Sequence, residues 1–237
     1  GEHDININLA TNPPAWHTAL LLAGLCAVPT VIWVCALLVR WAFALLALGD
    51  TGHVGFRVLA YARGDMETTF TFLGQEVGLV GLGALSTAIT VTFFYVLVLE
   101  IWRVRFGKNY SWFEYLLLAA AGARLLLMIP AANQWNSTVP PQPWSLYRNL
   151  PLTLLGLGTA YLILRDARRA GDRAFTWIGI MILVSYAFYI PVILFVQQAP
   201  TIGMLMIPKT MAYVVIGFIA YSSLYRAAPD VREGVPA

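Results

Sequence analysis

The sequence predicts an all-α polytopic integral membrane bundle with about six transmembrane helices and one short amphipathic or interfacial segment. The composition is 59% hydrophobic and 11% charged, whereas soluble domains carry about 25% charged residues. The mean hydropathy of +0.70 agrees with a surface that faces lipid. Unbroken apolar runs of roughly 20 residues recur, and they lack the polar and apolar alternation of a membrane barrel. Because backbone amides in hydrocarbon need internal partners, these runs predict helices.

The whole chain, 1–237, is expected to form one transmembrane helical domain. A polar tail, 1–15, precedes one long tilted helix at 16–48. Residues 49–76 carry two arginines, two aspartates and two glutamates, so they are expected to form an extramembrane amphipathic segment. Residues 77–226 hold the remaining spans before a polar tail at 227–237. The expected spans lie at about 77–101, 112–132, 148–166, 174–197 and 202–225.

The distribution of basic residues predicts the orientation of the chain. With six spans, one side of the membrane carries Arg103, Arg105, Lys108, Arg165, Arg168, Arg169, Arg173, Arg226 and Arg232. The other side carries only Arg40, Arg57, Arg63 and Arg148. Since basic residues accumulate in cytoplasmic segments, both termini are expected in the cytoplasm. Because the basic residues lie at helix ends, nucleic acid is not an expected partner, and the lipid bilayer is.

The apolar segments lack the residue patterns of the common intramembrane catalysts. The chain has three histidines, and only His17 lies near a span, so a bis-histidine haem site is not expected within it. We also find no Cys-x-x-Cys pair and no clustered intramembrane carboxylates. The sequence therefore predicts no catalytic residue, no metal site and no cofactor, although a bound lipid fits the composition. An enzyme is the class that the sequence supports least.

Two cations lie inside predicted spans. Arg124 is about halfway along the third span, and Lys209 is about two turns into the sixth, directly after Pro208. A charge at that depth costs at least about 2.5–3.5 kcal/mol, so each side chain should face a partner, a cavity or water. With no acid at matching depth, both cations are candidates for binding a carboxylate, a phosphate or a lipid headgroup. The alternative is that they snorkel or donate hydrogen bonds to backbone carbonyls.

The fifth span carries two polar residues that could line the same pocket. Ser185 and Tyr189 are four residues apart and share a helix face, and Pro191 leaves a backbone carbonyl free one turn earlier. They complete the candidate anion or lipid site with Arg124 and Lys209. The alternative is ordinary hydrogen bonding between helices around a proline kink.

A stripe of small residues is expected to mediate helix packing on the second span. It consists of Gly74, Gly78, Gly81, Ala84 and Ala88. Small residues at such spacing let helix backbones approach closely, within one bundle or in an oligomer. The stripe therefore favours a packing surface over a ligand site.

Three functional hypotheses remain open. The sequence favours a non-catalytic subunit of a larger membrane complex, with other subunits or copies of itself as partners, because it forms no complete catalytic or transport constellation. The alternative is a small carrier or ligand-binding bundle for a solute or lipid with an anionic group. A membrane sensory domain is the second alternative, and it would lack an output module, since only a short polar tail follows Arg226.

Overall fold

The computed structural model describes residues 15–72, 74–135, 137 and 141–225, and its fold is 82% helix. The described residues form six α-helices, one antiparallel β-hairpin and two short 3-10 turns. The helices are α1 (Ala15–Ala62), α2 (Leu79–Arg105), α3 (Trp112–Leu127), α4 (Trp144–Ala170), α5 (Arg173–Phe195) and α6 (Met206–Tyr225). The hairpin joins β1 (Thr69–Phe72) to β2 (Gln75–Gly78), and the 3-10 turns are η1 (Ala131–Asn133) and η2 (Pro200–Leu205). The predicted all-helical class is confirmed.

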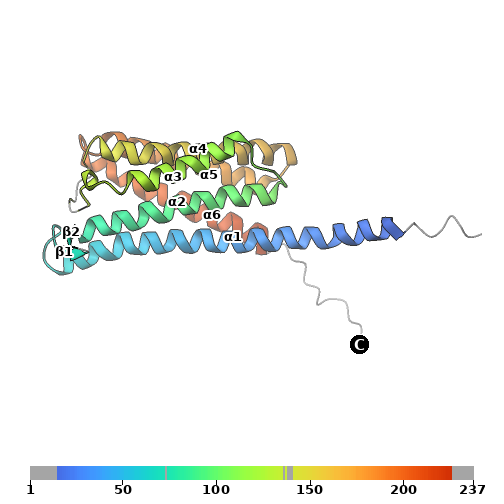
Figure 1. Ribbon diagram of the computed structural model, residues 1–237, viewed down its shortest axis with the longest axis horizontal. Helices are drawn as coiled ribbons and strands as arrows, with labels where there is room; N and C mark the ends of the chain where they lie inside the picture. Colours follow the sequence, from blue (N-terminus) through green and yellow to red (C-terminus); the bar gives the residue numbers. More distant parts are fainter. Residues whose placement is uncertain (1–14, 73, 136, 138–140, 226–237) are drawn as a thin grey trace, which may run out of the picture.

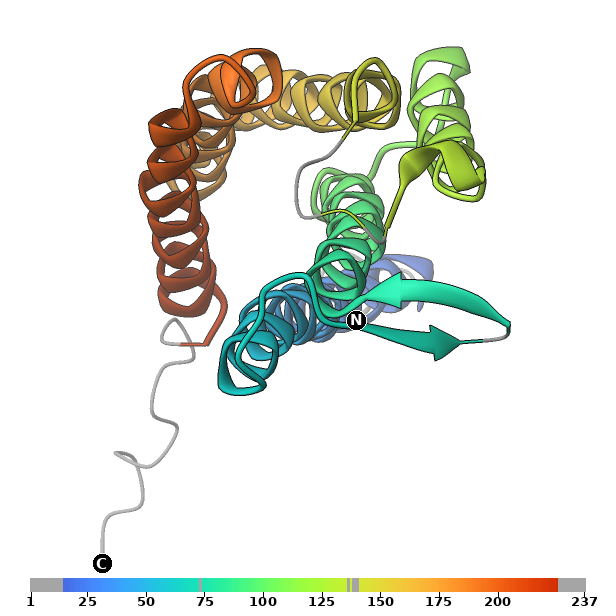
Figure 2. The same cartoon turned by 90° about the vertical axis from the view of Figure 1, so that its left-hand side faces the viewer.

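The helices form a ring that runs in chain order. Figure 2 shows α2 beside α1, then α3 and α4, then α5 and α6, with α6 returning to α1. One end of this bundle carries the β-hairpin and the α3–α4 connection, and we call it the hairpin end (Figure 1). The opposite end carries the connection at 106–111 and the α4–α5 turn, and we call it the basic end. Aromatic rings from α2, α5 and α6 fill the interior, with centroids 5.2 to 6.5 Å apart among Phe94, Tyr95, Tyr186 and Tyr213.

The first helix is longer than the sequence predicts. The expected end near Leu48 is wrong, because α1 continues without a break to Ala62, and only the rest of the 49–76 segment leaves the helix. Residues 49–62 contain no proline, and Gly49 and Gly52 lie against α2, so tertiary packing supports the helix where charges suggested its end. At 1.5 Å per residue the 48 residues span about 72 Å. The helix therefore extends beyond its neighbours in Figure 1.

Small residues bring α1 and α2 together, but they are only partly the predicted ones. Gly74 and Gly78 lie in the hairpin, so they are not part of a helical stripe. Gly81 instead lies against the backbone carbonyl of Trp135, while Ala84 and Ala88 are half-buried on α2. The close approach to α1 comes from glycines of both helices. Gly49 lies against Thr90, Gly52 against Ser86, and Gly83 against the backbone of His53.

Replacing Gly49 by alanine should weaken the contact between α1 and α2. The added Cβ would lie 1.9 Å from Oγ1 of Thr90, a buried side chain whose hydroxyl already bonds to the carbonyl of Ser86. We expect a loss of about 1–2 kcal/mol in unfolding free energy, measured by denaturant titration in detergent. Gly55 is the matched control on the same helix, because its Cβ would meet nothing within 4 Å. If Gly49→Ala is as stable as Gly55→Ala, the proposed packing is wrong.

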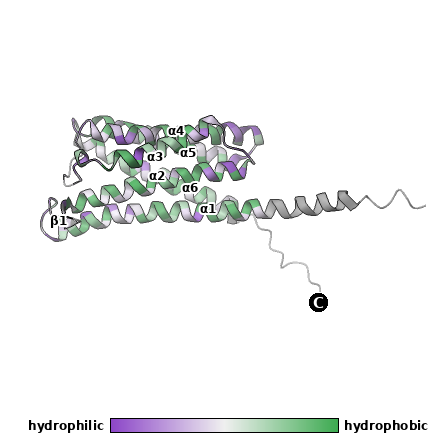
Figure 3. Cartoon of the chain, viewed as in Figure 1, coloured by the Kyte–Doolittle hydropathy of each residue, from purple (hydrophilic) through white to green (hydrophobic). Residues whose placement is uncertain are grey.

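Five helices of the described chain are long and apolar enough to cross a membrane. These stretches are Thr30–Ala62, Leu79–Arg105, Trp144–Ala170, Arg173–Phe195 and Thr201–Leu224. The remaining helix, α3, has 16 residues and so measures about 24 Å. In Figure 3 the hydrophobic colour follows the lengths of the helices, and large apolar side chains such as Trp33, Trp41 and Phe218 are exposed. Such exposed apolar surface is consistent with an integral membrane protein.

Candidate functional site

Three cationic side chains are buried at the hairpin end of the bundle. Arg124 is 2% exposed and Lys209 is 9% exposed, so both lie inside the protein, as the sequence predicts. Arg124 is not halfway along its helix, because α3 ends at Leu127 and places it in the last turn. Arg148, which the sequence assigned to a helix end outside the core, is also buried, four residues after α4 begins. We call Arg124, Arg148 and Lys209 the cation cluster.

Arg124 is the member of the cluster with two polar atoms that lack partners among the described residues. Its Nε and Nη1 atoms are buried, and neither has a hydrogen-bond partner among the described residues. The guanidinium lies close enough to Tyr186 and Tyr189 to interact with them electrostatically. Buried polar groups are nearly always hydrogen-bonded, and an unpartnered charge is especially unfavourable. The position of Arg124 therefore calls for a partner that the described chain does not supply.

The other two cations have aromatic partners. The Arg148 guanidinium lies 4.4 Å from the centroid of the Trp135 ring, and its Nη1 donates to Oδ1 of Asn133 at 3.3 Å. The Lys209 Nζ lies 4.6 Å from the centroid of Tyr189 and 5.4 Å from that of Tyr213. An aromatic face stabilises a cation without neutralising it. Both side chains thus remain positive charges beside Arg124.

Carboxylates contribute little at this site. None of the ion pairs found among the described residues includes a member of the cation cluster. Asp50 of α1 attracts Lys209 through space, but the two do not form an ion pair. Arg124 in turn repels both Arg148 and Lys209. The interior of the hairpin end therefore carries more positive than negative charge.

Four hydrogen-bonded tyrosines lie beside the cation cluster. The hydroxyls of Tyr95 and Tyr213 lie 2.8 Å apart and join α2 to α6. The Tyr186 hydroxyl donates to the carbonyl of Leu152 at 2.8 Å. Gly156 of α4 makes room for this ring, since a Cβ there would lie 2.0 Å from the Tyr186 hydroxyl oxygen. Tyr189 donates to Oδ1 of Asn149 at 2.9 Å. These bonds fix the positions of the rings that lie beside Arg124 and Lys209.

The structure brings the four predicted site residues to one region. Ser185 is buried within electrostatic reach of the Tyr213 hydroxyl, but its Oγ atom has no hydrogen bond of good geometry among the described residues. Tyr189 lies one turn later on α5, and the Lys209 ammonium group lies over its ring. Sequence reasoning missed Arg148, Tyr95 and Tyr213. Tyr213 was open to prediction, since it is four residues after Lys209 and so shares its helix face.

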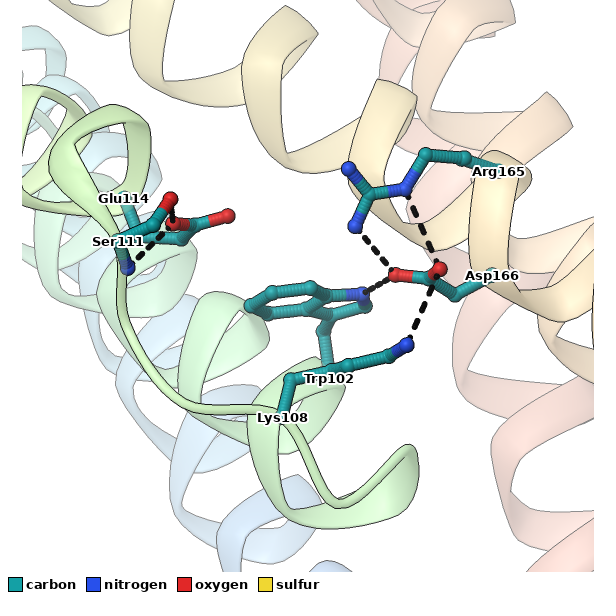
Figure 4. Close-up of polar contacts among 6 residues, drawn as sticks. All are labelled: Trp102, Lys108, Ser111, Glu114, Arg165 and Asp166. Carbon is teal, nitrogen blue, oxygen red and sulfur yellow. Dashed lines mark hydrogen bonds and ion pairs between the residues drawn. The ribbon is translucent and has the colours of Figure 1, made fainter.

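A second buried polar group, centred on Asp166, lies at the basic end (Figure 4). Asp166 of α4 is 3% exposed and accepts hydrogen bonds from Trp102 Nε1 at 3.0 Å and from Arg165 Nη2 at 2.7 Å. Its other oxygen forms an ion pair with Lys108 at 3.6 Å. Because these partners come from α2, α4 and the 106–111 connection, the carboxylate fastens three segments together. All of its acceptor oxygens are occupied by protein donors, so we assign it a structural role.

Other groups at the basic end are also satisfied locally. Glu114 accepts from the Ser111 backbone N–H at 2.7 Å and from the Ser111 hydroxyl, which forms a capping box at the start of α3. Tyr110 donates to Glu100 at 2.7 Å. Burial, together with this hydrogen bond, raises the pKa of Tyr110 above its ordinary value. It therefore stays a neutral donor at physiological pH, and this end offers no unpartnered buried charge among the described residues.

Comparisons with protein-family models, with curated proteins and with solved structures find no match to this chain.

Proposed function

We propose that this protein is a multi-pass membrane protein whose helical bundle binds a small anionic group at the cation cluster. The observation that carries the proposal is the buried Arg124 guanidinium, two of whose nitrogens lack a partner among the described residues. A carboxylate or phosphate is the partner that a guanidinium binds best, through short charge-assisted hydrogen bonds. This supports the ligand-binding alternative over the complex-subunit hypothesis, which stays a prediction.

The proposed membrane placement uses all six helices. Five of them are long enough to cross on their own, and α3 crosses together with the segment that follows it, up to η1. The basic end then faces the cytoplasm with both termini. In this placement one basic residue changes sides relative to the count made from the sequence. Because α1 is antiparallel to α2 and Gly49 lies beside Thr90, Arg40 lies toward the basic end, and not with Arg57 and Arg63 as the sequence suggested. The charge asymmetry becomes larger.

Helix geometry adds to the attraction for an anion. The cation cluster lies where α4 and α6 begin, so the partial positive charges of these two helix ends point into the same region. Arg148 and Lys209 lie near helix N-termini, where a cation is unfavourable unless an anion accompanies it. A bound anion would relieve the repulsion among the three cations and supply hydrogen-bond acceptors to Arg124. Ser185 Oγ is a further donor for the same ligand.

The test is stabilisation of the purified protein by a simple oxyanion. In detergent, inorganic phosphate should raise the unfolding temperature in a saturable manner, whereas chloride at equal ionic strength should not. A ligand at 100 times its Kd stabilises the native state by about 2.7 kcal/mol. Short-chain phosphatidic acid in the same assay tells a lipid phosphate from the free ion. Equal shifts with phosphate and chloride would show that only ionic strength acts, and the proposal would fail.

A further inference from the structure

Two surface pockets flank the α4–α5 turn at the basic end, far from the cation cluster. The first, of about 510 Å³, is lined by Arg105, Phe106, Ala170, Gly171, Asp172 and Arg173. The second, of about 250 Å³, is lined by Ala167, Arg168, Gly171, Arg173, Thr176 and Trp177. They share Gly171 and Arg173, so the two pockets adjoin at a single turn. We call the two together the turn pocket.

The turn pocket is positively charged. Its carboxylate, Asp172, is already engaged, because it accepts two hydrogen bonds from Arg105 and one from the backbone N–H of Phe175. Arg168 and Arg173 are exposed, and neither forms an ion pair with a described residue. Arg105 therefore balances Asp172, and two guanidinium groups remain to attract an anion. The left-handed conformation of Gly171, at φ +68°, lets the chain turn tightly between them.

Each part of the turn pocket has one aromatic lining residue. Phe106 lines the first part, and the exposed Trp177 lines the second, five residues into α5. Exposed tryptophan at the end of an apolar helix is typical of the level where lipid headgroups meet acyl chains. In the proposed placement, the turn pocket lies at this level in the cytoplasmic leaflet. Guanidinium groups over a phosphate, with an indole beside the acyl chains, are the contacts that an anionic phospholipid needs.

We infer that the turn pocket binds the phosphate headgroup of an anionic phospholipid through Arg168 and Arg173, with Trp177 beside its acyl chains. This site is separate from the cation cluster, and it rests on the proposed membrane placement alone. The phosphate chemistry is shared with free inorganic phosphate. The acyl contact of Trp177 is what favours the lipid source.

The experiment compares two charge-matched double variants by native mass spectrometry from mixed micelles. Phosphatidylglycerol should bind the protein in preference to phosphatidylcholine. In Arg168→Gln/Arg173→Gln this preference should fall roughly 20- to 30-fold, because each arginine near a membrane surface contributes a factor of about five. The control Arg57→Gln/Arg63→Gln removes two exposed cations at the hairpin end, and it should keep the preference. All four positions are exposed, so both variants should fold.

Three results would overturn the inference. Equal losses in the two double variants would show that net charge alone attracts the lipid. No preference for phosphatidylglycerol in the unchanged protein would remove the site. Displacement of the lipid by millimolar inorganic phosphate would assign the pocket to a soluble ion. A failure of membrane insertion, on which the inference rests, is seen separately, since the protein would then stay monodisperse without detergent.

Discussion

Arg124→Met should make the ligand-free protein more stable and should abolish its response to phosphate. The buried guanidinium lacks protein partners for Nε and Nη1, so a methionine of similar length removes a desolvated charge without removing a hydrogen bond at these atoms. Replacing even a paired buried charge by apolar groups of similar volume is often neutral or stabilises a protein by about 1–4 kcal/mol, and Arg124 forms no ion pair with a described residue. We expect a gain in this range by denaturant titration in detergent, and no phosphate-induced rise in the unfolding temperature.

Arg148→Met provides the contrast for this prediction. Arg148 is also buried, but its guanidinium contacts the Trp135 ring and bonds to Asn133. Its loss should therefore lower stability, by about 1.5–3 kcal/mol for a hydrogen bond to a charged group. Opposite signs of the change in unfolding free energy at these two buried arginines distinguish a ligand-binding cation from a structural one. If Arg124→Met is destabilised like Arg148→Met and still responds to phosphate, Arg124 is structural and the site is wrong.

Asp166→Ala should cause the largest loss of stability among the basic-end residues. The substitution leaves the buried indole N–H of Trp102 without its acceptor and removes the anion that holds Arg165 and Lys108. Breaking a buried ion pair costs about 3–5 kcal/mol. The side chains of Arg165 and Lys108 are 31% and 42% exposed and can regain water, so we expect about 2–4 kcal/mol.

Denaturant titration in detergent measures this effect, with Glu67→Ala as the control. Glu67 is an exposed carboxylate near the β-hairpin, and its side chain forms no ion pair with a described residue. Its loss should change stability by less than about 0.5 kcal/mol. A similarly small effect at Asp166 would show that the three segments of the basic end are held by packing alone.

The long apolar runs made the helices of the bundle predictable. Backbone hydrogen bonding in an apolar surrounding leaves few alternatives to a helix, so the positions of α2, α4, α5 and α6 follow from hydropathy. The burial of Arg124 and Lys209 was also predictable, because both lie inside long apolar runs of the sequence, where a charge needs an interior position. These inferences depend on single segments and their surroundings, which a sequence describes well.

Contacts between distant segments were not predictable in the same way. The charges at Asp50 and Arg57 suggested a break after Leu48, whereas packing of Gly49 and Gly52 against α2 keeps α1 helical to Ala62. The bond between Tyr95 and Tyr213 joins residues 118 positions apart, and no local pattern marks it. Arg148 looked like an ordinary helix-end cation until Trp135 and Asn133 were seen to cover it.

The central claim is that an anion completes the coordination of Arg124 inside the bundle. Anomalous diffraction from crystals grown with selenate, an oxyanion with a strong anomalous signal, tests it most directly. We expect a selenium peak within about 3–4 Å of the Arg124 guanidinium nitrogens, on the side of Lys209, because charge-assisted bonds place the ligand oxygens at about 2.8 Å. Ordered selenate elsewhere in the crystal, with a protein carbonyl or carboxylate bound to Arg124, would contradict the claim.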